Sequence, residues 1–283
     1  MSHGVAELPP ARIDEEAHTM EITLRTNGAA RTVRVSEGSG GAALVELVGR
    51  KPAAHDLERL TAAVRHVLRL DEDLSDFYAL AAADPDLAWA AKGAGRMVQS
   101  ATVFEEVVKT VCTTNCTWSA TERMVGALVE HLGEPAPGAP PEGAHGRAFP
   151  TPQAMADAPE DWYRDVARTG YRGAYLRSLA GSVVDGEVDL EELGTASQDE
   201  LPDDEVERRL LALPGVGPYA AAHVMMLIGR YSRLILDSWT RPKYARLNGG
   251  DVVKDKEIVA RFEPYGRYAG LAFWLYLTQD WVP

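Results

Sequence analysis

The chain has 283 residues with 42 acidic and 29 basic side chains, so its formal net charge is −13 at pH 7. No run reaches the ~18 apolar residues that span a bilayer. The N-terminal stretch MSHGVAELPPARIDEEAH lacks the basic and apolar blocks of a secretory signal. The 2 cysteines cannot build a disulfide framework or supply four cluster ligands. We therefore expect a cytoplasmic globular protein without a membrane segment.

The first 70 residues predict a small β-containing domain. Residues 20–24 and 31–35 alternate and are rich in β-branched side chains, and Asn27-Gly28 between them is typical of a tight hairpin. Residues 43–48 form another candidate strand after a glycine-rich turn at 38–41. From Leu57 onward the apolar spacing changes to that of a helix.

Residues 71–283 predict a second, mainly helical domain. Helices are expected within 73–83, 102–114, 119–133, 151–157, 161–168, 171–186, 203–213 and 218–229. Gly133 is predicted as a C-terminal cap, and Asp203 or Asp204 as an N-cap. Residues 133–150 contain five prolines and four glycines and predict a loop. The expected fold class is mainly α with a small N-terminal β region (α+β).

The negative total charge hides a local excess of basic residues. Residues 207–268 contain 11 basic and 6 acidic side chains, a balance of +5, so the rest of the chain carries −18. Such a segment indicates either a phosphate-binding face on an acidic body or a solvated mixed-charge surface.

Residues 210–239, LLALPGVGPYAAAHVMMLIGRYSRLILDSW, predict a helix, a tight turn and a second helix. Pro214 ends the first helix, Gly215 and Gly217 permit close backbone approach, and Pro218 suits the first position of the next helix. The glycine amides with Val216 between them, and the helix N-terminus, form an anion site that fits a nucleic-acid phosphate. A backbone contact of this kind is insensitive to base sequence.

The stretch LPGVGPYAAAHV resembles the helix–hairpin–helix of the base-excision DNA glycosylases, which include endonuclease III and the adenine, 8-oxoguanine and alkyladenine glycosylases. The blocks at 104–118, 170–180 and 265–277 are also similar to that family, so the resemblance covers residues 71–283. An N-terminal sheet suits the 8-oxoguanine and alkyladenine branches. The resemblance implies that the partner is double-stranded DNA with a damaged base, and that the protein is a nucleoid-associated monomer.

The resemblance also assigns the chemistry. The family's catalytic aspartate matches Asp237, twenty residues after Gly217. A carboxylate there would stabilise the sugar cation and orient water; as an alternative, Asp237 caps a helix. Where bifunctional members have a lysine, this chain has Tyr219, which cannot form a Schiff base. The family resemblance thus implies a monofunctional enzyme. It implies no iron–sulfur cluster or other cofactor. It also implies that backbone carbonyls of the hairpin hold a monovalent cation.

The remaining candidate residues each have a structural alternative. Tyr219, Trp118 and His223 are candidates for the base pocket, with core packing as the alternative. Four residues are candidates for DNA contacts. Asn115 lies in the stretch that resembles the family's DNA-wedging loop, and a plain turn is its alternative. The others are Trp239, with core packing as the alternative, and Arg241 and Lys243, with solvated surface as the alternative. Cys112 and Cys116 lack nearby partners for a metal.

The substrate follows from the number of acids. No second carboxylate stands out as a general acid, which favours N-alkylated purines because these cationic bases leave without protonation. An oxidised or mismatched base remains the alternative substrate, and a non-catalytic helix–hairpin–helix DNA clamp remains the alternative function. Asp237 separates the two functions, since a clamp does not need it.

Overall fold

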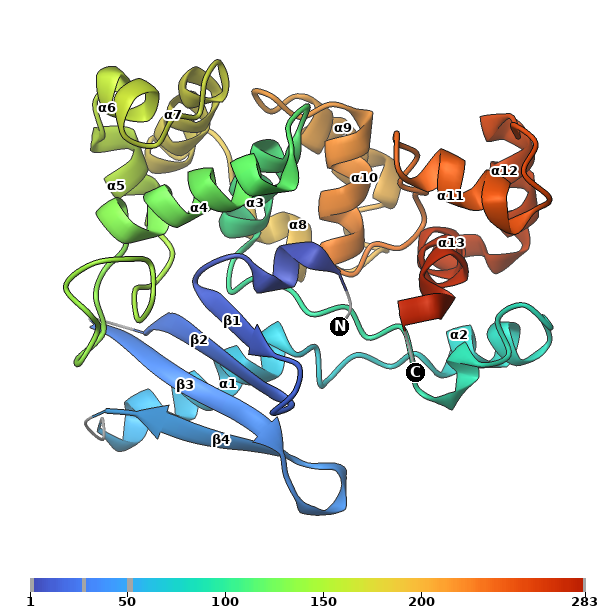
Figure 1. The fold of residues 1–283 in the computed structure, drawn as a ribbon, viewed down its shortest axis with the longest axis horizontal. Coiled ribbons are helices and arrows are strands. Elements are labelled where there is room, and N and C mark those ends of the chain that lie inside the picture. Colours follow the sequence, from blue (N-terminus) through green and yellow to red (C-terminus); the bar gives the residue numbers. More distant parts are fainter. Residues whose placement is uncertain (1–2, 27–28, 50–52, 282–283) are drawn as a thin grey trace. The chain divides into compact units, whose positions relative to one another are not determined.

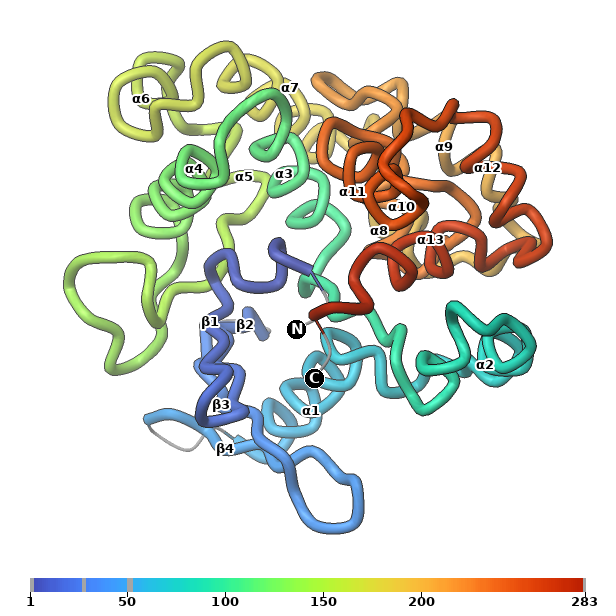
Figure 2. Tube along the Cα trace, turned by 45° about the vertical axis from the view of Figure 1, so that its right-hand side comes forward, coloured from blue at the N-terminus to red at the C-terminus, as the bar shows by residue number. Residues whose placement is uncertain are grey.

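The computed structural model describes residues 3–26, 29–49 and 53–281. The chain divides into two compact units, visible in Figures 1 and 2. The sheet unit contains residues 3–68 and 99–192, and the hairpin unit contains residues 69–98 and 193–281. The predicted boundary at residue 70 thus lies where the chain first leaves the sheet unit, whereas residues 99–192 group with the sheet.

The sheet unit begins with a four-stranded antiparallel sheet in the order β1-β2-β3-β4. Its strands are β1 (Ala11–Asp14), β2 (Thr19–Thr26), β3 (Ala29–Glu37) and β4 (Ala43–Val48). Ile22 of β2 pairs with Ala11 and with Val33, and all three are buried. Helix α1 (Ala54–Val67) packs against β2. The predicted Asn27-Gly28 turn lies outside the described residues.

Five helices complete the sheet unit: α3 (Val103–Thr113), α4 (Trp118–Leu132), α5 (Pro152–Asp157), α6 (Glu160–Asp165) and α7 (Arg172–Val184). Thr102 and Thr117 cap α3 and α4 through their hydroxyl oxygens, which accept backbone amides at 3.1 and 3.3 Å. Helix α7 packs against α3, α5 and α6. The expected class, mainly α with a small N-terminal antiparallel sheet, is confirmed.

Gly133 follows the last residue of α4, as predicted, but for a different physical reason. Its φ of −77° is open to any residue, so no left-handed cap forms. A Cβ at this position would lie 2.3 Å from the carbonyl oxygen of Ala148 and 2.4 Å from that of Val129. Glycine is therefore required because the loop over residues 133–150 returns against the end of the helix.

The hairpin unit contains α2 (Ser75–Ala82), α9 (Asp203–Leu211), α10 (Pro218–Leu227), α11 (Thr240–Leu247), α12 (Asp255–Phe262) and α13 (Ala269–Thr278), and the short α8 (Glu191–Thr195) leads into it. Every residue of α13 is buried, and α11 and α12 pack against it. Helix α10 packs against α9.

The predicted N-cap of α9 is wrong. Pro202 occupies the cap position, and Asp203 is the first residue of the helix. The Asp203 carboxylate instead accepts hydrogen bonds from Arg230 and Ser232, which follow α10. A long-range pair therefore takes the side chain that a local capping rule would use.

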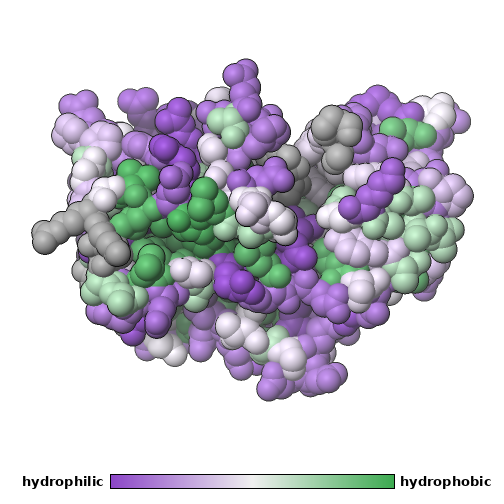
Figure 3. Space-filling model, turned by 90° about the horizontal axis from the view of Figure 1, so that it is seen from below, coloured by the Kyte–Doolittle hydropathy of each residue, from purple (hydrophilic) through white to green (hydrophobic). Residues whose placement is uncertain are grey.

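Apolar side chains are also exposed in the sheet unit. Strand β4 is an edge strand, and its Leu44 and Val48 are 51% and 38% exposed. Figure 3 shows green apolar residues gathered on the left of the face seen from below.

Over residues 3–26, 29–49 and 53–281, no helix combines the length and apolar character needed to span a membrane.

Candidate active site

The turn between α9 and α10 is built by its two glycines. Gly215 has a φ of +79°, a conformation that favours glycine, and the Val216 amide donates to Leu213 O at 3.2 Å to close the turn. Gly217 is the extended N-cap of α10, and a Cβ there would meet no atom within 4 Å. The Ala221 amide donates to Gly217 O at 2.9 Å and begins the α10 ladder. Gly217 is exposed and lies directly before the first turn of α10. The amides of that first turn have no acceptor within the helix.

Asp237 lies in the turn that precedes α11. Its Oδ1 accepts hydrogen bonds from the amides of Trp239 and Thr240 at 2.8 and 2.6 Å, and its own amide donates to Thr240 Oγ1 at 2.8 Å. The side chain is half-buried. No hydrogen bond from the described residues reaches Oδ2. The carboxylate is therefore fixed by one oxygen, and the other is available to a ligand.

Tyr219 and His223 lie one turn apart on α10, with ring centroids 5.7 Å apart. Tyr219 is half-buried, whereas His223 is only 6% exposed. Burial lowers the pKa of His223 to about 4, so the imidazole is uncharged at neutral pH. Neither ring nitrogen of His223 has a hydrogen-bond partner among the described residues.

Trp239 joins an aromatic cluster beside Asp237. Its ring centroid lies 5.8 Å from that of Trp274 and 5.8 Å from that of Trp281, and the latter two rings are 5.9 Å apart. Trp239 is 38% exposed and Trp274 is buried. The Trp239 indole therefore packs against two other rings and is still partly accessible to solvent.

Arg241 and Lys243, the two predicted phosphate contacts, are both engaged with acids. Arg241 binds Asp255 through two hydrogen bonds of 2.8 and 2.9 Å, and Lys243 Nζ lies 2.5 Å from Asp280 Oδ2. Both acids are about half exposed. A phosphate would therefore compete with a carboxylate for each cation.

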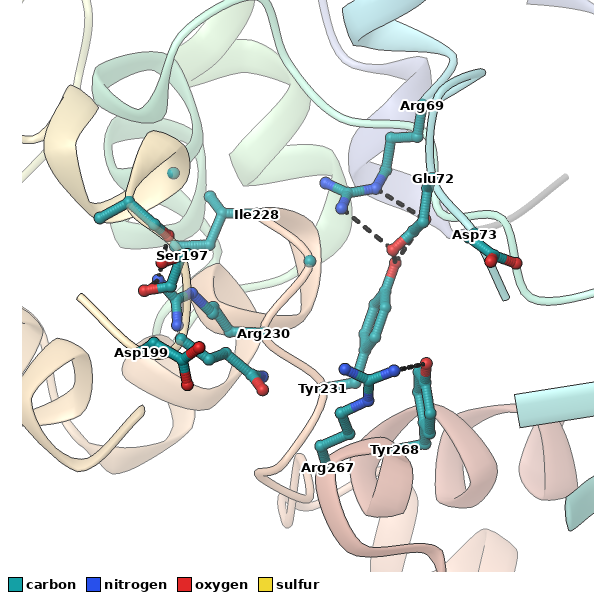
Figure 4. A pocket seen from close by; sticks show the side chains of 14 residues that line it. Arg69, Glu72, Asp73, Ser197, Asp199, Ile228, Arg230, Tyr231, Arg267 and Tyr268 are labelled. Carbon is teal, nitrogen blue, oxygen red and sulfur yellow. Dashed lines mark hydrogen bonds and ion pairs between the residues drawn. The ribbon is translucent and has the colours of Figure 1, made fainter. Parts of the chain in front are cut away.

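A polar cavity of about 470 Å³ also lies in the hairpin unit (Figure 4). Glu72 accepts from Arg69 at 2.9 and 3.1 Å and from the Tyr231 hydroxyl at 2.7 Å. Arg230 donates to Leu201 O at 2.9 Å and to Asp203 at 3.1 Å. The guanidinium groups of Arg69 and Arg230 are thus occupied by protein acceptors, which indicates a structural role.

Asn115 and Trp118 belong to the sheet unit rather than to the hairpin unit. Trp118 begins α4 and is 41% exposed, and its ring packs on Gly4, where a Cβ would lie 3.1 Å from Cη2. Asn115 has a φ of +47° in the turn between α3 and α4. Their assignments to the base pocket and to DNA binding stay predictions.

An exposed aromatic pair beside Asn115 was not predicted. Asn115 Nδ2 donates to the Tyr171 hydroxyl at 3.4 Å, and this contact lowers the pKa of Tyr171. Tyr171 and Tyr175 are 55% and 39% exposed and pack edge to face with centroids 5.9 Å apart. Their spacing of four residues in a helix is the signal that could have identified this surface.

The two cysteines and the hairpin carbonyls are possible ion ligands, and their surroundings in the described chain bear on that role. Over residues 3–26, 29–49 and 53–281, no three His, Cys, Asp or Glu side chains form a group suited to a metal. Burial raises the pKa of the Cys112 thiol to about 12, and Cys116 Sγ donates to Cys112 O. The carbonyls of Leu213 and Gly217 each accept one amide and keep a lone pair. The monovalent cation at the hairpin carbonyls stays a prediction.

Comparison with known proteins places the fold. No protein-family model and no curated protein sequence matches this chain. Among solved structures, it is similar to a 3-methyladenine DNA glycosylase from Archaeoglobus fulgidus at a TM-score of 0.74 and 20% identity, covering 99% of this chain and 93% of that one. MBOgg1 in complex with a low-affinity DNA ligand gives 0.69 and 18%, covering 96% and 99%. The Clostridium acetobutylicum 8-oxoguanine glycosylase/lyase gives 0.68 and 18%, with the same coverage. The chain therefore has the fold of these DNA glycosylases.

Proposed function

We propose that this chain is a monofunctional DNA N-glycosylase, which flips a damaged base out of duplex DNA and hydrolyses its N-glycosidic bond. The observation that carries the proposal is the Asp237 carboxylate. One oxygen accepts hydrogen bonds from two amides in the turn before α11, and no described residue bonds the other. A glycosylase needs such a fixed negative charge, whereas a passive DNA clamp does not.

The chemistry assigned to Asp237 is stabilisation of a sugar cation. As the N-glycosidic bond breaks, positive charge develops at C1′ and the ring oxygen, and the carboxylate faces that charge. The same carboxylate orients a water and accepts its proton as the water adds to C1′. The bond pair leaves with the base, and an abasic site remains. Fixing Oδ1 to the amides of Trp239 and Thr240 lowers the reorganisation that the reaction requires.

The hairpin is assigned to one DNA strand. The Gly217 backbone is exposed, and its extended conformation leads directly into α10. A phosphate would accept hydrogen bonds from amides in this turn, with the positive end of the helix dipole beside it. The contact would hold the damaged strand for any base sequence.

The proposed substrates are alkylated purines. These bases carry a positive charge before cleavage and leave without a general acid, which agrees with a single assigned carboxylate. Their charged rings bind aromatic faces, such as those of Tyr219 and Trp239. Tyr219 offers no amine for a Schiff base, so the reaction ends at the abasic site. The fold is shared by proteins titled as a 3-methyladenine glycosylase and as an 8-oxoguanine glycosylase/lyase, which makes an oxidised base the second substrate class to test.

The test uses duplexes that each contain one defined lesion, namely 7-methylguanine, 8-oxoguanine or a mismatched base, with an undamaged duplex as control. After incubation, alkali cleaves any abasic site. We expect alkali-dependent cleavage of the 7-methylguanine duplex and no cleavage before alkali. Duplex binding without release of any base would identify a non-catalytic DNA-binding protein, and cleavage before alkali would contradict the monofunctional reaction.

A further inference from the structure

The sheet unit contains a cavity of about 640 Å³, to which the proposed reaction assigns no role. Its walls come from β2, α1, the start of α3, the segment that leads into α5 and the chain from the end of α7 to Glu191. All of its lining residues belong to the sheet unit. The volume lies within the range of cavities that hold small organic ligands in proteins.

The inner walls of this sheet-unit cavity are mainly apolar. Leu24, Phe104 and Phe149 are buried, and the two phenyl rings pack edge to face with centroids 6.5 Å apart. Val183 and Val188 line the cavity from the chain at the end of α7. Walls of this kind favour a ligand with an apolar or aromatic body, because its contact with them removes apolar surface from water.

Carboxylates outnumber basic groups on the same walls. Glu105, Asp189 and Glu191 line the cavity, and Arg25 is the one basic side chain among the described residues that line it. Arg25 pairs with Glu134 at 3.0 Å, so its charge is already matched by an acid outside the lining. The walls therefore favour a ligand that carries a positive charge.

Glu105 also belongs to a buried cluster with more acid than base. It is 2% exposed, and its Oε1 lies 2.6 Å from Lys109 Nζ. Glu106 is 1% exposed, its Oε1 accepts the Ser100 amide, and its Oε2 has no hydrogen-bond partner among the described residues. Burial raises the pKa of Glu106 to about 7. Two buried carboxylates thus share one ammonium, and a cation in the cavity would add positive charge beside them.

We propose that the sheet-unit cavity binds an organic cation, namely an amine with an apolar or aromatic body. The body packs on Phe104 and Phe149, and the ammonium faces the carboxylates of Glu105 and Asp189. The face of an aromatic ring also attracts a cation, and Lys109 Nζ already lies 5.8 Å from the centroid of the Phe149 ring.

Three probes that share one apolar body test the preference for a cation. They are 4-phenylbutylamine, the neutral 4-phenylbutanol and the anionic 4-phenylbutyrate. Ligand-observed NMR titration of the full chain at neutral pH is expected to give the amine a Kd below about 1 mM, at least about fivefold lower than that of the alcohol, with the carboxylate weakest. Absence of amine binding, or equal affinity for the amine and the alcohol, would overturn the proposal.

A pair of variants on α1 locates the bound amine. Ala63 lines the cavity, and Ala62 is the exposed residue before it. Ala63→Leu fills part of the cavity and is expected to weaken amine binding at least about tenfold, whereas Ala62→Leu should leave it within about twofold. Thermal unfolding shows whether each variant is folded. Unchanged amine affinity in folded Ala63→Leu would mean that the amine binds elsewhere, against the proposal.

A second pair tests the charge without altering the core. Asp189 is exposed, and its Oδ1 accepts the Glu192 amide at 3.1 Å, so Asp189→Asn keeps an oxygen for that bond. This variant is expected to weaken the amine about threefold and to leave the alcohol unchanged. Asp185→Asn, at the exposed end of α7, should change neither affinity.

An unchanged ratio of amine to alcohol affinity in Asp189→Asn would overturn the proposal even if Ala63→Leu does not fold. Base release plays no part in these measurements. Failure of this proposal therefore leaves the proposed glycosylase function standing, and failure of that function leaves the amine site standing.

Discussion

Arg230 and His223 are two buried polar side chains of the hairpin unit, and their surroundings differ sharply. Arg230 follows α10, is 4% exposed, and donates to Leu201 O, to Ala196 O and to the Asp203 carboxylate. His223 lies within α10, is 6% exposed, and has no hydrogen-bond partner among the described residues. The first pattern is expected of a group that holds the fold together, and the second leaves two buried polar atoms of an α10 side chain unpaired. Asp237 combines both patterns, since one oxygen holds a turn and the other is not bonded by the described chain.

The largest expected effect is that of Asp237→Asn, which separates the two roles of this residue. Asparagine keeps an oxygen for the amides of Trp239 and Thr240, so the free energy of unfolding should change by less than about 0.5 kcal/mol. The charge that faces the sugar cation is lost, and base release should fall by about 10²–10⁴-fold. Single-turnover release of 7-methylguanine measures the rate. Asp255→Asn, at an exposed acid of the same unit, should retain the wild-type rate, and a fully active Asp237→Asn would remove Asp237 from the mechanism.

Arg230→Met tests the opposite side of the comparison. Removing one member of a buried ion pair leaves Asp203 without its cation and takes the Arg230 donor away from the carbonyls of Leu201 and Ala196, so unfolding in urea should require about 3–5 kcal/mol less free energy. The rate of base release per folded molecule should be unchanged. Lost catalysis in a fully folded variant would show that Arg230 belongs to the active site and that the comparison with His223 fails.

The pH dependence of stability gives a third test. The folded pKa of His223, about 4, lies below its unfolded value near 6.5, so the unfolded chain binds more protons between these values. The contribution of neutral His223 to the free energy of unfolding is therefore fully present above pH 6.5. It is lost as the pH falls toward 4, and the total loss is about 3 kcal/mol. Urea unfolding of wild type and His223→Phe across this range measures the difference. The variant should lose about 3 kcal/mol less than wild type, and parallel curves would mean that the imidazole is solvated.

The comparison also explains how much the sequence could predict. Local patterns identified α3, α4, α9 and α10, because apolar spacing or a proline–glycine turn fixes each of them within a few residues. Strand β1 was missed because its four residues alternate too briefly to produce a pattern. Asp203 was assigned to a local cap because its partner, Arg230, lies 27 residues away in the chain.

The candidate site divides in the same way. The hairpin and the spacing to Asp237 are local features, so the sequence could indicate them before any coordinates. The ring nitrogens of His223 are unpaired because the described fold brings no hydrogen-bonding group to them. The spacing of residues in the sequence does not contain that information. Tyr171 and Asn115 lie 56 residues apart, and their contact likewise requires the folded sheet unit.

The smallest expected effects concern the two hairpin glycines. Gly215 tests the backbone conformation of the turn, and Gly217 tests its contact with DNA. Gly215 has a φ of +79°, so Gly215→Ala should cost about 1–2 kcal/mol of folding free energy through backbone strain. Gly217 has a φ of −103° and open space around a Cβ, so Gly217→Ala should change stability by less than about 0.5 kcal/mol. The added methyl would nevertheless keep a phosphate away from the amides of the turn, and duplex affinity should fall about tenfold. Fluorescence anisotropy of a labelled duplex at fixed salt measures this loss. Unchanged affinity in Gly217→Ala, with full stability, would mean that DNA does not contact this turn, and the strand would then have to be held elsewhere on the protein.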